Sequence, residues 1–136
     1  MSERWRSVCR DGRLPARADF PPESMIDWMG HIQIVEVVRE GDDARLRVRL
    51  VGTRIVYYEG RDNTGVFLDE AVPEEQRDEV LEPYHRSLND RTPVYSEFYP
   101  CSDAAISSKL ERLILPLATD GNIVDQFLVA IYRQAT

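Results

Sequence analysis

An arginine among aliphatic residues is the position of this sequence that most clearly points to chemistry. Arg112 alternates with Leu110 and Ile114, so it shares their face of a predicted strand. A guanidinium on a buried face needs a partner, because an unpaired buried charge is costly. Two interpretations are open: Arg112 clamps the carboxylate or phosphate of a ligand, or it pairs internally with an acid. The acids considered for that pair are Asp62, Asp69 and Asp125.

Tyr84 and Asp125 are the other polar residues for which the sequence suggests a role. Tyr84 falls on the apolar side of a helical segment, where its hydroxyl either contacts a ligand or completes the core. Asp125 lies on the last predicted strand and either forms hydrogen bonds on the covered face or points outward. For both residues the structural role is the favoured interpretation.

The sequence has none of the short motifs of common enzymes, such as GxSxG, HExxH, GxGxxG or a P-loop. His31 and His85 are isolated, and Cys9 and Cys101 are far apart without a CxxC pair, so no metal-ligand spacing exists. We therefore expect no catalytic residue and no metal. An α+β enzyme of unrecognised type remains an alternative, and it would need an acid or a histidine with a shifted pKa in a pocket.

The size and charge of the chain exclude several classes of protein. Its 136 residues, 43% hydrophobic and 30% charged, suit one globular domain. A net charge of −7 argues against nucleic acid as a partner. No apolar run approaches the roughly 20 residues that span a bilayer, and the N-terminus lacks the apolar region of a secretory signal. We expect a cytoplasmic protein without a membrane partner.

Hydrophobic periodicity predicts five strands. The second is the clearest, because Leu46, Val48 and Leu50 alternate with three arginines. The dipeptide Asp120-Gly121 predicts a hairpin between the last two strands. The predicted strands are 31–38, 44–51, 92–99, 108–118 and 123–134.

A helical region separates the second strand from the third. We predict short helices over 53–59 and 67–72, joined by a loop over 60–66, and then a longer helix over 73–90. Pro83 lies inside the longer helix, which must kink or restart there. The order predicts an α+β fold, in which a five-stranded antiparallel sheet carries the short helices and the longer helix on one face.

The element order and several segments resemble the PAS domain family. The segments "RLVGTRIV" (49–56), "GRDNTG" (60–65) and "ERLILPL" (111–117) resemble a bacterial subgroup of small stand-alone PAS proteins. In that subgroup a segment like "GRLPARADF" precedes the sheet, and the stretch "TGVFLDEAVPEE" also resembles the PAS region before the long helix. The resemblance implies a PAS domain over 31–136, with the first and last strands paired at the centre of the sheet. Residues 1–30 form a helical and irregular N-terminal extension.

The resemblance also implies a pocket between the sheet and its helices, with the irregular stretch after the second strand as one wall. In the alternative interpretation, side chains fill this space and no ligand binds. We expect the pocket to be lined by Ile55, Tyr58, Leu68, Val80, Tyr84, Arg112 and Phe127.

The family's known cofactors do not fit the residues of this chain. Gly65 stands where light-oxygen-voltage domains carry their flavin-binding cysteine, two residues before a Phe-Leu pair. His85 lies later on the long helix than the haem-binding histidine of the family, and Cys101 is a poor match for the cysteine of a yellow-chromophore site. We therefore expect neither a flavin adduct nor haem, and the small-molecule ligand is unknown.

The resemblance implies a non-catalytic signalling module that senses a small molecule, binds a protein partner, or both. A purely structural dimerisation adaptor with a filled core is the alternative. We expect a homodimer, because the outer face of the sheet (Leu113, Leu115, Leu117) needs a cover. The extension can fold back on its own sheet or cover a second copy. Its residues suited to this are Trp5, Leu14, Phe20, Met25, Ile26 and Trp28, of which Trp5, Met25 and Trp28 are the predicted interface.

Overall fold

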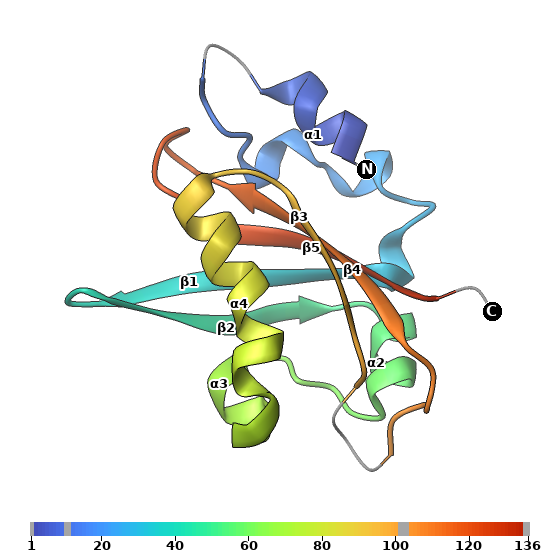
Figure 1. The fold of residues 1–136 in the computed structure, drawn as a ribbon. Coiled ribbons are helices and arrows are strands. Elements are labelled where there is room, and N and C mark those ends of the chain that lie inside the picture. The colour runs from blue at the N-terminus through green and yellow to red at the C-terminus, as the bar shows by residue number, and fades with distance from the viewer. Residues whose placement is uncertain (1, 10–11, 101–103, 135–136) are drawn as a thin grey trace.

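The computed structural model describes residues 2–9, 12–100 and 104–134, and a five-stranded antiparallel sheet forms their centre (Figure 1). The strand order is β2-β1-β5-β4-β3, so the first and last strands are neighbours at the centre, as predicted. Observed strand ends differ from the predicted ones by at most three residues. The strands are β1 Ile32–Glu40, β2 Asp43–Val51, β3 Val94–Phe98, β4 Leu110–Leu117 and β5 Gln126–Arg133.

The largest difference from the predicted strand ends, at the start of β5, has a local cause. The Asp120 carboxylate accepts hydrogen bonds from the backbone N–H groups of Asn122 and Ile123, both at 2.8 Å. These bonds hold the residues in the turn, and β5 begins only at Gln126.

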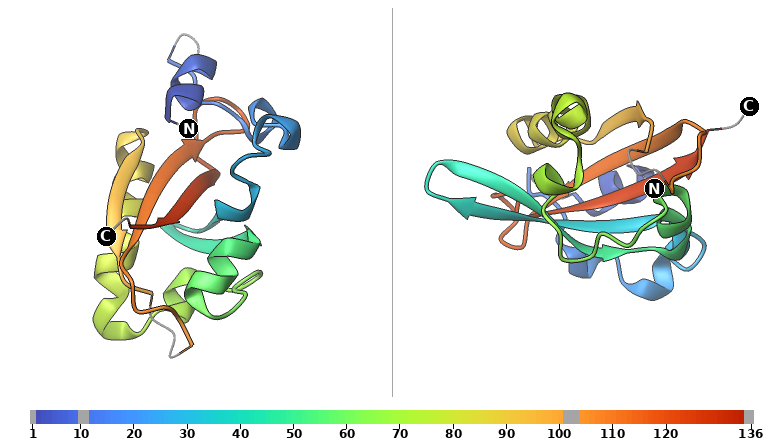
Figure 2. Two further views of the ribbon diagram at one scale, coloured as in Figure 1. Left: turned by 90° about the vertical axis from the view of Figure 1, so that its right-hand side faces the viewer. Right: turned by 90° about the horizontal axis from the view of Figure 1, so that it is seen from below.

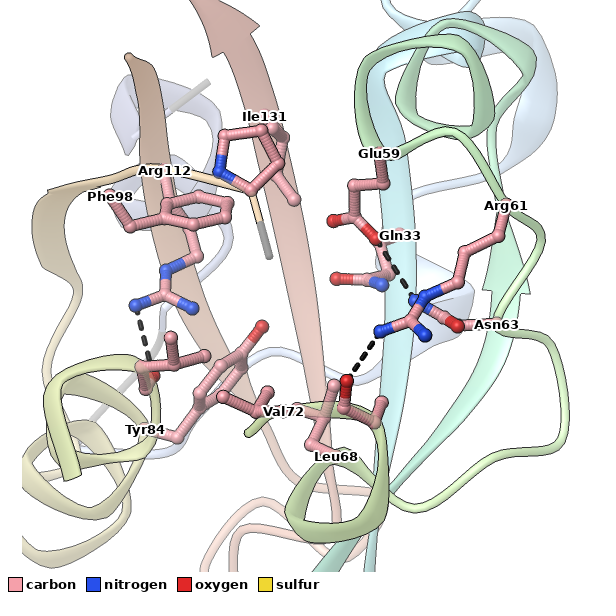
Figure 3. A pocket seen from close by; sticks show the side chains of 13 residues that line it. Gln33, Glu59, Arg61, Asn63, Leu68, Val72, Tyr84, Phe98, Arg112 and Ile131 are labelled. Carbon is pink, nitrogen blue, oxygen red and sulfur yellow. Dashed lines mark hydrogen bonds between the residues drawn. The ribbon is translucent and has the colours of Figure 1, made fainter. Parts of the chain in front are cut away.

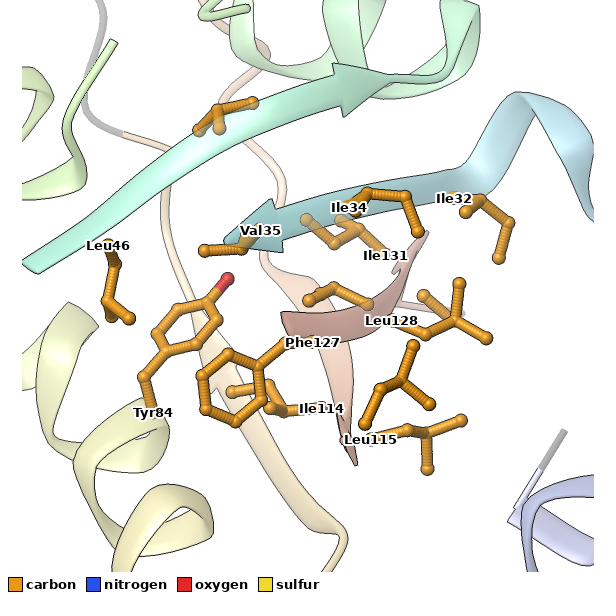
Figure 4. Close-up of a cluster of buried hydrophobic side chains, with 14 of the residues drawn as sticks. Ile32, Ile34, Val35, Leu46, Tyr84, Ile114, Leu115, Phe127, Leu128 and Ile131 are labelled. Atoms are coloured by element: carbon orange, nitrogen blue, oxygen red, sulfur yellow. The ribbon is translucent and has the colours of Figure 1, made fainter. Parts of the chain in front are cut away.

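Helices cover the inner face of the sheet, and the N-terminal extension covers the outer face (Figure 2). The register places Arg112 opposite Ile131 on the inner face, and Gln33 opposite Val129. The apolar core continues through the sheet to both faces (Figure 4). The helices after β2 are α2 Thr53–Glu59, α3 Leu68–Ala71 and α4 Glu74–Asp90.

Helix α4 continues through Pro83 as a single element, so the helix does not restart there, which was one of the two predicted alternatives. Proline lacks an N–H group, so the carbonyl of Glu79 loses its partner within the helix. Glu79 is exposed, which leaves that carbonyl to water. The next carbonyl, that of Val80, faces inward and accepts a hydrogen bond from Arg112.

The extension folds back on its own sheet. Helix α1 (Ser2–Val8) places Trp5 so that its indole Nε1 donates to the carbonyl of Pro116 at 2.8 Å. The backbone N–H of Ala118 donates to the carbonyl of Pro15, also at 2.8 Å. Leu115 and Leu117 are buried beneath this cover. The extension therefore covers the outer face of its own sheet and not that of a second copy.

This placement changes the interface expected from the sequence. Trp5 and Met25 are buried within their own chain, and Trp28 is half-buried, so the first two do not face a partner. Ile26 departs from expectation in the opposite direction, because 73% of it is exposed. The structure forms this part of the extension from short 3-10 turns, Pro22–Ser24 and Met29–His31, so helical periodicity does not separate these neighbours.

The substitution Trp5→Ala tests whether α1 is an integral part of the fold. We expect the free energy of unfolding to fall by about 3 kcal/mol, because the change removes a buried ring and leaves a cavity. Urea denaturation measures this. Arg6→Ala, at an exposed position of the same helix, is the control and should change stability by less than about 0.5 kcal/mol. Equal small effects of both substitutions would contradict the integral role of α1.

Candidate functional site

A small cavity lies between the inner face of the sheet and helices α2, α3 and α4 (Figure 3). Its volume of about 40 Å³ corresponds to a few water molecules. Apolar residues form part of the wall: Leu68, Val72, Val80, Phe98 and Ile131. The polar side chains that line it are Gln33, Glu59, Arg61, Asn63, Tyr84 and Arg112.

Arg112 is a buried cation with neutral partners. Only 2% of the residue is exposed. Its Nε donates to the Ser96 hydroxyl and its Nη2 to the Val80 carbonyl, both at 3.0 Å. The guanidinium carbon lies over the rings of Tyr84 and Phe98, at 4.9 and 4.7 Å from their centroids. Two hydrogen bonds and two aromatic faces therefore fix its position.

Of the two interpretations of Arg112 that the sequence left open, the structure does not show the internal ion pair. Within the part of the chain that the structure describes, no carboxylate pairs with Arg112. The three acids considered for this role bond elsewhere. Asp69 pairs with Arg45 at 2.9 Å, Asp62 accepts from Thr64, and Asp125 accepts from the Thr119 backbone N–H.

These other partners also act on the acids themselves. The hydrogen bond from Arg45 lowers the pKa of Asp69, and hydrogen bonds from Thr64 lower the pKa of Asp62. Asp125 holds the turn before β5, which is the structural role favoured for it from the sequence. Each acid is thus occupied by a neighbour at a loop or sheet edge, and none is directed toward Arg112.

Gln33 contributes a buried amide on the central strand β1. Only 3% of the residue is exposed, and its side chain forms no hydrogen bond with any described residue. Buried polar groups are normally hydrogen-bonded. An amide without a partner in the wall of a cavity leaves one donor group and one acceptor available to whatever occupies that cavity.

Tyr84 directs its hydroxyl into the space between Arg112 and Gln33 (Figure 3). Burial raises the pKa of Tyr84, although the charge of Arg112 and its interaction with the hydroxyl act in the opposite direction. The hydroxyl therefore stays protonated and can donate. Behind the ring, Phe127 packs edge-on at a centroid distance of 5.5 Å.

Glu59 and Asn63 face Arg112 from the opposite wall (Figure 3). The Asn63 side-chain amide donates to the Glu59 carboxylate at 3.0 Å. Burial raises the pKa of Glu59, with Arg61, Asn63 and Arg112 opposing the shift. Gly60 between them ends α2 in the left-handed region, at φ 76°. A Cβ there would also lie 2.4 Å from the backbone of Ala104, so only glycine fits.

The structure brings together some of the predicted pocket residues and separates others. Leu68, Val80, Tyr84 and Arg112 line the cavity. Ile55 and Phe127 are instead fully buried in the core, and Tyr58 packs near His31 at a centroid distance of 5.9 Å. The placement of these three in the pocket wall is corrected: they support the wall from behind or beside it.

Sequence reasoning missed Gln33, Glu59 and Asn63. Gln33 carried a weaker signal than Arg112, because only Val35 of its two neighbours at i±2 is aliphatic and the other is His31. Glu59 and Asn63 had no such signal, because they stand in a polar loop region where carboxylates and amides normally face solvent. Only the arch of the chain over the sheet turns them inward.

The strand order, the helices between β2 and β3, and the cavity beneath them are the features of a PAS-type α+β fold. The chain belongs to the PAS domain family, whose pattern matches residues 1–132 and so includes the N-terminal extension. PAS domains are typically sensory or signalling modules. No curated protein matches the chain.

Solved structures agree with this fold. One comes from a study of a flavin analogue and the mechanism of a light-oxygen-voltage domain. It has a TM-score of 0.61 and 10% identity, with 83% of each chain covered. Another is a sensory box sensor histidine kinase from Vibrio cholerae. Its TM-score is 0.57 at 13% identity, covering 88% of this chain and 94% of that one. At these identities the likeness shows the fold alone.

The raised pKa of Glu59 predicts a pH dependence of stability. A carboxyl whose pKa is higher in the folded chain than in the unfolded one contributes stability at low pH. That contribution is lost as the pH rises from the ordinary value of 4.5 through the folded-state pKa. Glu59→Gln should therefore flatten this part of the stability curve and stabilise the protein at neutral pH relative to wild type.

Urea denaturation across this pH range measures the effect, with Glu79→Gln as control. Glu79 is exposed on α4, and its substitution should leave the shape of the curve unchanged. Parallel curves for wild type and Glu59→Gln would contradict the raised pKa.

Proposed function

We propose that this PAS domain is a non-catalytic sensory module that binds a small polar molecule in the cavity and passes the signal on by association. The observation that carries the proposal is the buried Gln33 amide, which faces the cavity without a hydrogen-bond partner among described residues. Its amide atoms reach the accessible space of the cavity and are not sealed in the core, so they can bond to a molecule that enters it.

The alternatives fit the cavity less well. A purely structural adaptor needs a filled core, whereas three walls here direct polar groups into one space (Figure 3). An enzyme would need a second reactive group beside Glu59, whose raised pKa resembles that of a catalytic acid. Neither His31 nor His85 lines the cavity. We therefore favour binding over catalysis.

We also propose that the domain holds neither flavin nor haem. A cavity of about 40 Å³ is far below the 300–1,000 Å³ of typical cofactor sites. Gly65 lies in the loop beside β2, where its backbone N–H donates to the Val48 carbonyl at 2.7 Å. His85 faces a crevice between α4 and β2 and not the cavity.

A second copy of the chain is the partner that we propose for the exposed apolar surface. A groove of about 470 Å³ runs between the extension and β1–β2, with Phe20, Met25 and Ile34 in its wall. Met29, which also lines the groove, is 43% exposed, and Ile26, next to Met25 in the sequence, is 73% exposed. A molecule that carries both an exposed apolar side chain and an apolar groove suits an isologous two-fold contact, in which each copy inserts its Ile26 into the groove of the other.

Other predictions from the sequence stay predictions. Among the described residues, no helix is long and apolar enough to cross a membrane. No cluster of described residues could hold a metal ion. A protein signalling partner, a cytoplasmic location and the absence of nucleic-acid binding remain expectations based on composition and on the resemblance.

Filling the cavity tests the proposed ligand site. A thermal-shift screen of small polar molecules should find ligands that stabilise the wild type, because binding to the folded state raises its stability. Ala71→Leu places extra methyl groups in the open space and should abolish this response. Its own stability should stay within about 1.5 kcal/mol of wild type. Ligands that stabilise both proteins equally would place their site outside the cavity.

Replacing the exposed Ile26 side chain tests the dimer. Ile26→Asp should turn a dimer into a monomer, because two carboxylates would enter an apolar contact. Sedimentation at tens of micromolar measures the association. Asp27→Asn, at the exposed neighbouring position, is the control and should leave it unchanged. A monomeric wild type, or a dimer unaffected by Ile26→Asp, would contradict this interface.

A further inference from the structure

The charges around the cavity are distributed unevenly between its walls. Arg112 and the Tyr84 hydroxyl stand on one side, and the Gln33 amide reaches the same space from β1 (Figure 3). All three can donate hydrogen bonds. Glu59, on the far side, already accepts from Asn63.

The guanidinium of Arg112 has unused donors. It carries five N–H groups, of which one on Nε and one on Nη2 reach Ser96 and Val80. No described residue accepts a hydrogen bond of normal length from Nη1. The second terminal nitrogen points toward the Tyr84 hydroxyl and the cavity (Figure 3).

The direct partners of Arg112 among the described residues carry no negative charge, although Glu59 across the cavity interacts with it electrostatically. A hydroxyl, a carbonyl and two aromatic faces stabilise a cation without neutralising it. A buried charge is usually balanced by an opposite one, because desolvation otherwise costs several kcal/mol. The same contacts hold the side chain rigid, so little conformational entropy would be lost when an anion binds.

We propose that the cavity binds a small carboxylate anion, held by the free edge of Arg112 together with the Tyr84 hydroxyl and the Gln33 amide. This rests on the proposed function and names the ligand class. A carboxylate accepts hydrogen bonds with both oxygens and matches the planar guanidinium. The cavity volume of about 40 Å³ limits the ligand to the size of formate or acetate. A methyl group would meet the apolar part of the wall, at Phe98 and Ile131.

The charges of Glu59 and Arg112 should act on anion binding with opposite signs. The Glu59 carboxylate lies across the cavity from Arg112, so an ionised Glu59 repels an anion bound there. The charged or titratable groups facing Glu59 are Arg61, beside it at the mouth, Arg112 on β4 and Tyr84 on α4. Removing the negative charge of Glu59 should strengthen binding, whereas removing the positive charge of Arg112 should weaken it.

NMR titration of the full 136-residue chain tests the proposal. The probes are sodium acetate and sodium formate, with sodium chloride at equal ionic strength and neutral acetamide as comparisons. Acetamide has nearly the shape of acetate without its charge. For a ligand with four non-hydrogen atoms, such as acetate, the lowest attainable Kd is on the order of tens of micromolar. We expect acetate or formate to shift the Gln33 side-chain amide and the Arg112 Nε resonances saturably, and acetamide and chloride to bind at least about tenfold more weakly.

Three variants give expected changes of opposite sign. Arg112→Met should weaken acetate binding about tenfold or more, because it removes charge-assisted hydrogen bonds. Glu59→Gln should tighten it several-fold at neutral pH. Tyr84→Phe removes one hydroxyl and should weaken it about fivefold, and it keeps the test valid if Arg112→Met does not fold.

The outcomes separate this inference from the proposed function. Equal binding of acetamide and acetate would overturn the anion inference and leave the ligand site standing. Chloride binding as tightly as acetate would overturn the carboxylate class. If neither acetate nor formate shifts the resonances of the cavity residues, the inference is wrong. The wider thermal-shift screen tests the proposed function separately.

Discussion

The burial of one guanidinium beneath the helices is the constraint on which the inner half of this structure depends. Arg112 stands on β4, and its contacts come from two other elements. Ser96 and Phe98 lie on β3, while Val80 and Tyr84 lie on α4. A charge in this position is tolerated only while these partners remain in place. The requirement therefore fixes the edge strand and the long helix relative to the sheet.

Pro83 lies within α4, three residues after the Val80 carbonyl that Arg112 binds. It interrupts the helical hydrogen bonds at Glu79, next to the carbonyl that Arg112 binds. The proline that predicted a break in the sequence thus marks the turn of the helix that receives the guanidinium.

The sheet is covered differently on its two faces, and each cover leaves a different surface. On the outer face the extension buries Trp5, Leu115 and Leu117 and leaves an apolar groove and an exposed Ile26. On the inner face, helices α2, α3 and α4 do not fill all the space above the sheet, and a cavity with polar lining residues remains beneath them. The inner surface suits a small polar ligand, and the outer one suits another protein surface.

The sequence by itself determined the strand segments, because period-2 alternation and turn residues are local patterns. The resemblance of several segments to the PAS family implied the order of these strands in the sheet. The sequence also determined that Arg112 faces inward, since its neighbours at i±2 are aliphatic. Only the tertiary structure decided what Arg112 contacts, because Ser96, Val80 and Phe98 are distant in sequence. It likewise turned Glu59 and Asn63 into the cavity and buried Trp5 against its own sheet. These outcomes depend on how a loop and a terminal segment fold over surfaces formed by other elements, and local pattern carries no information about that.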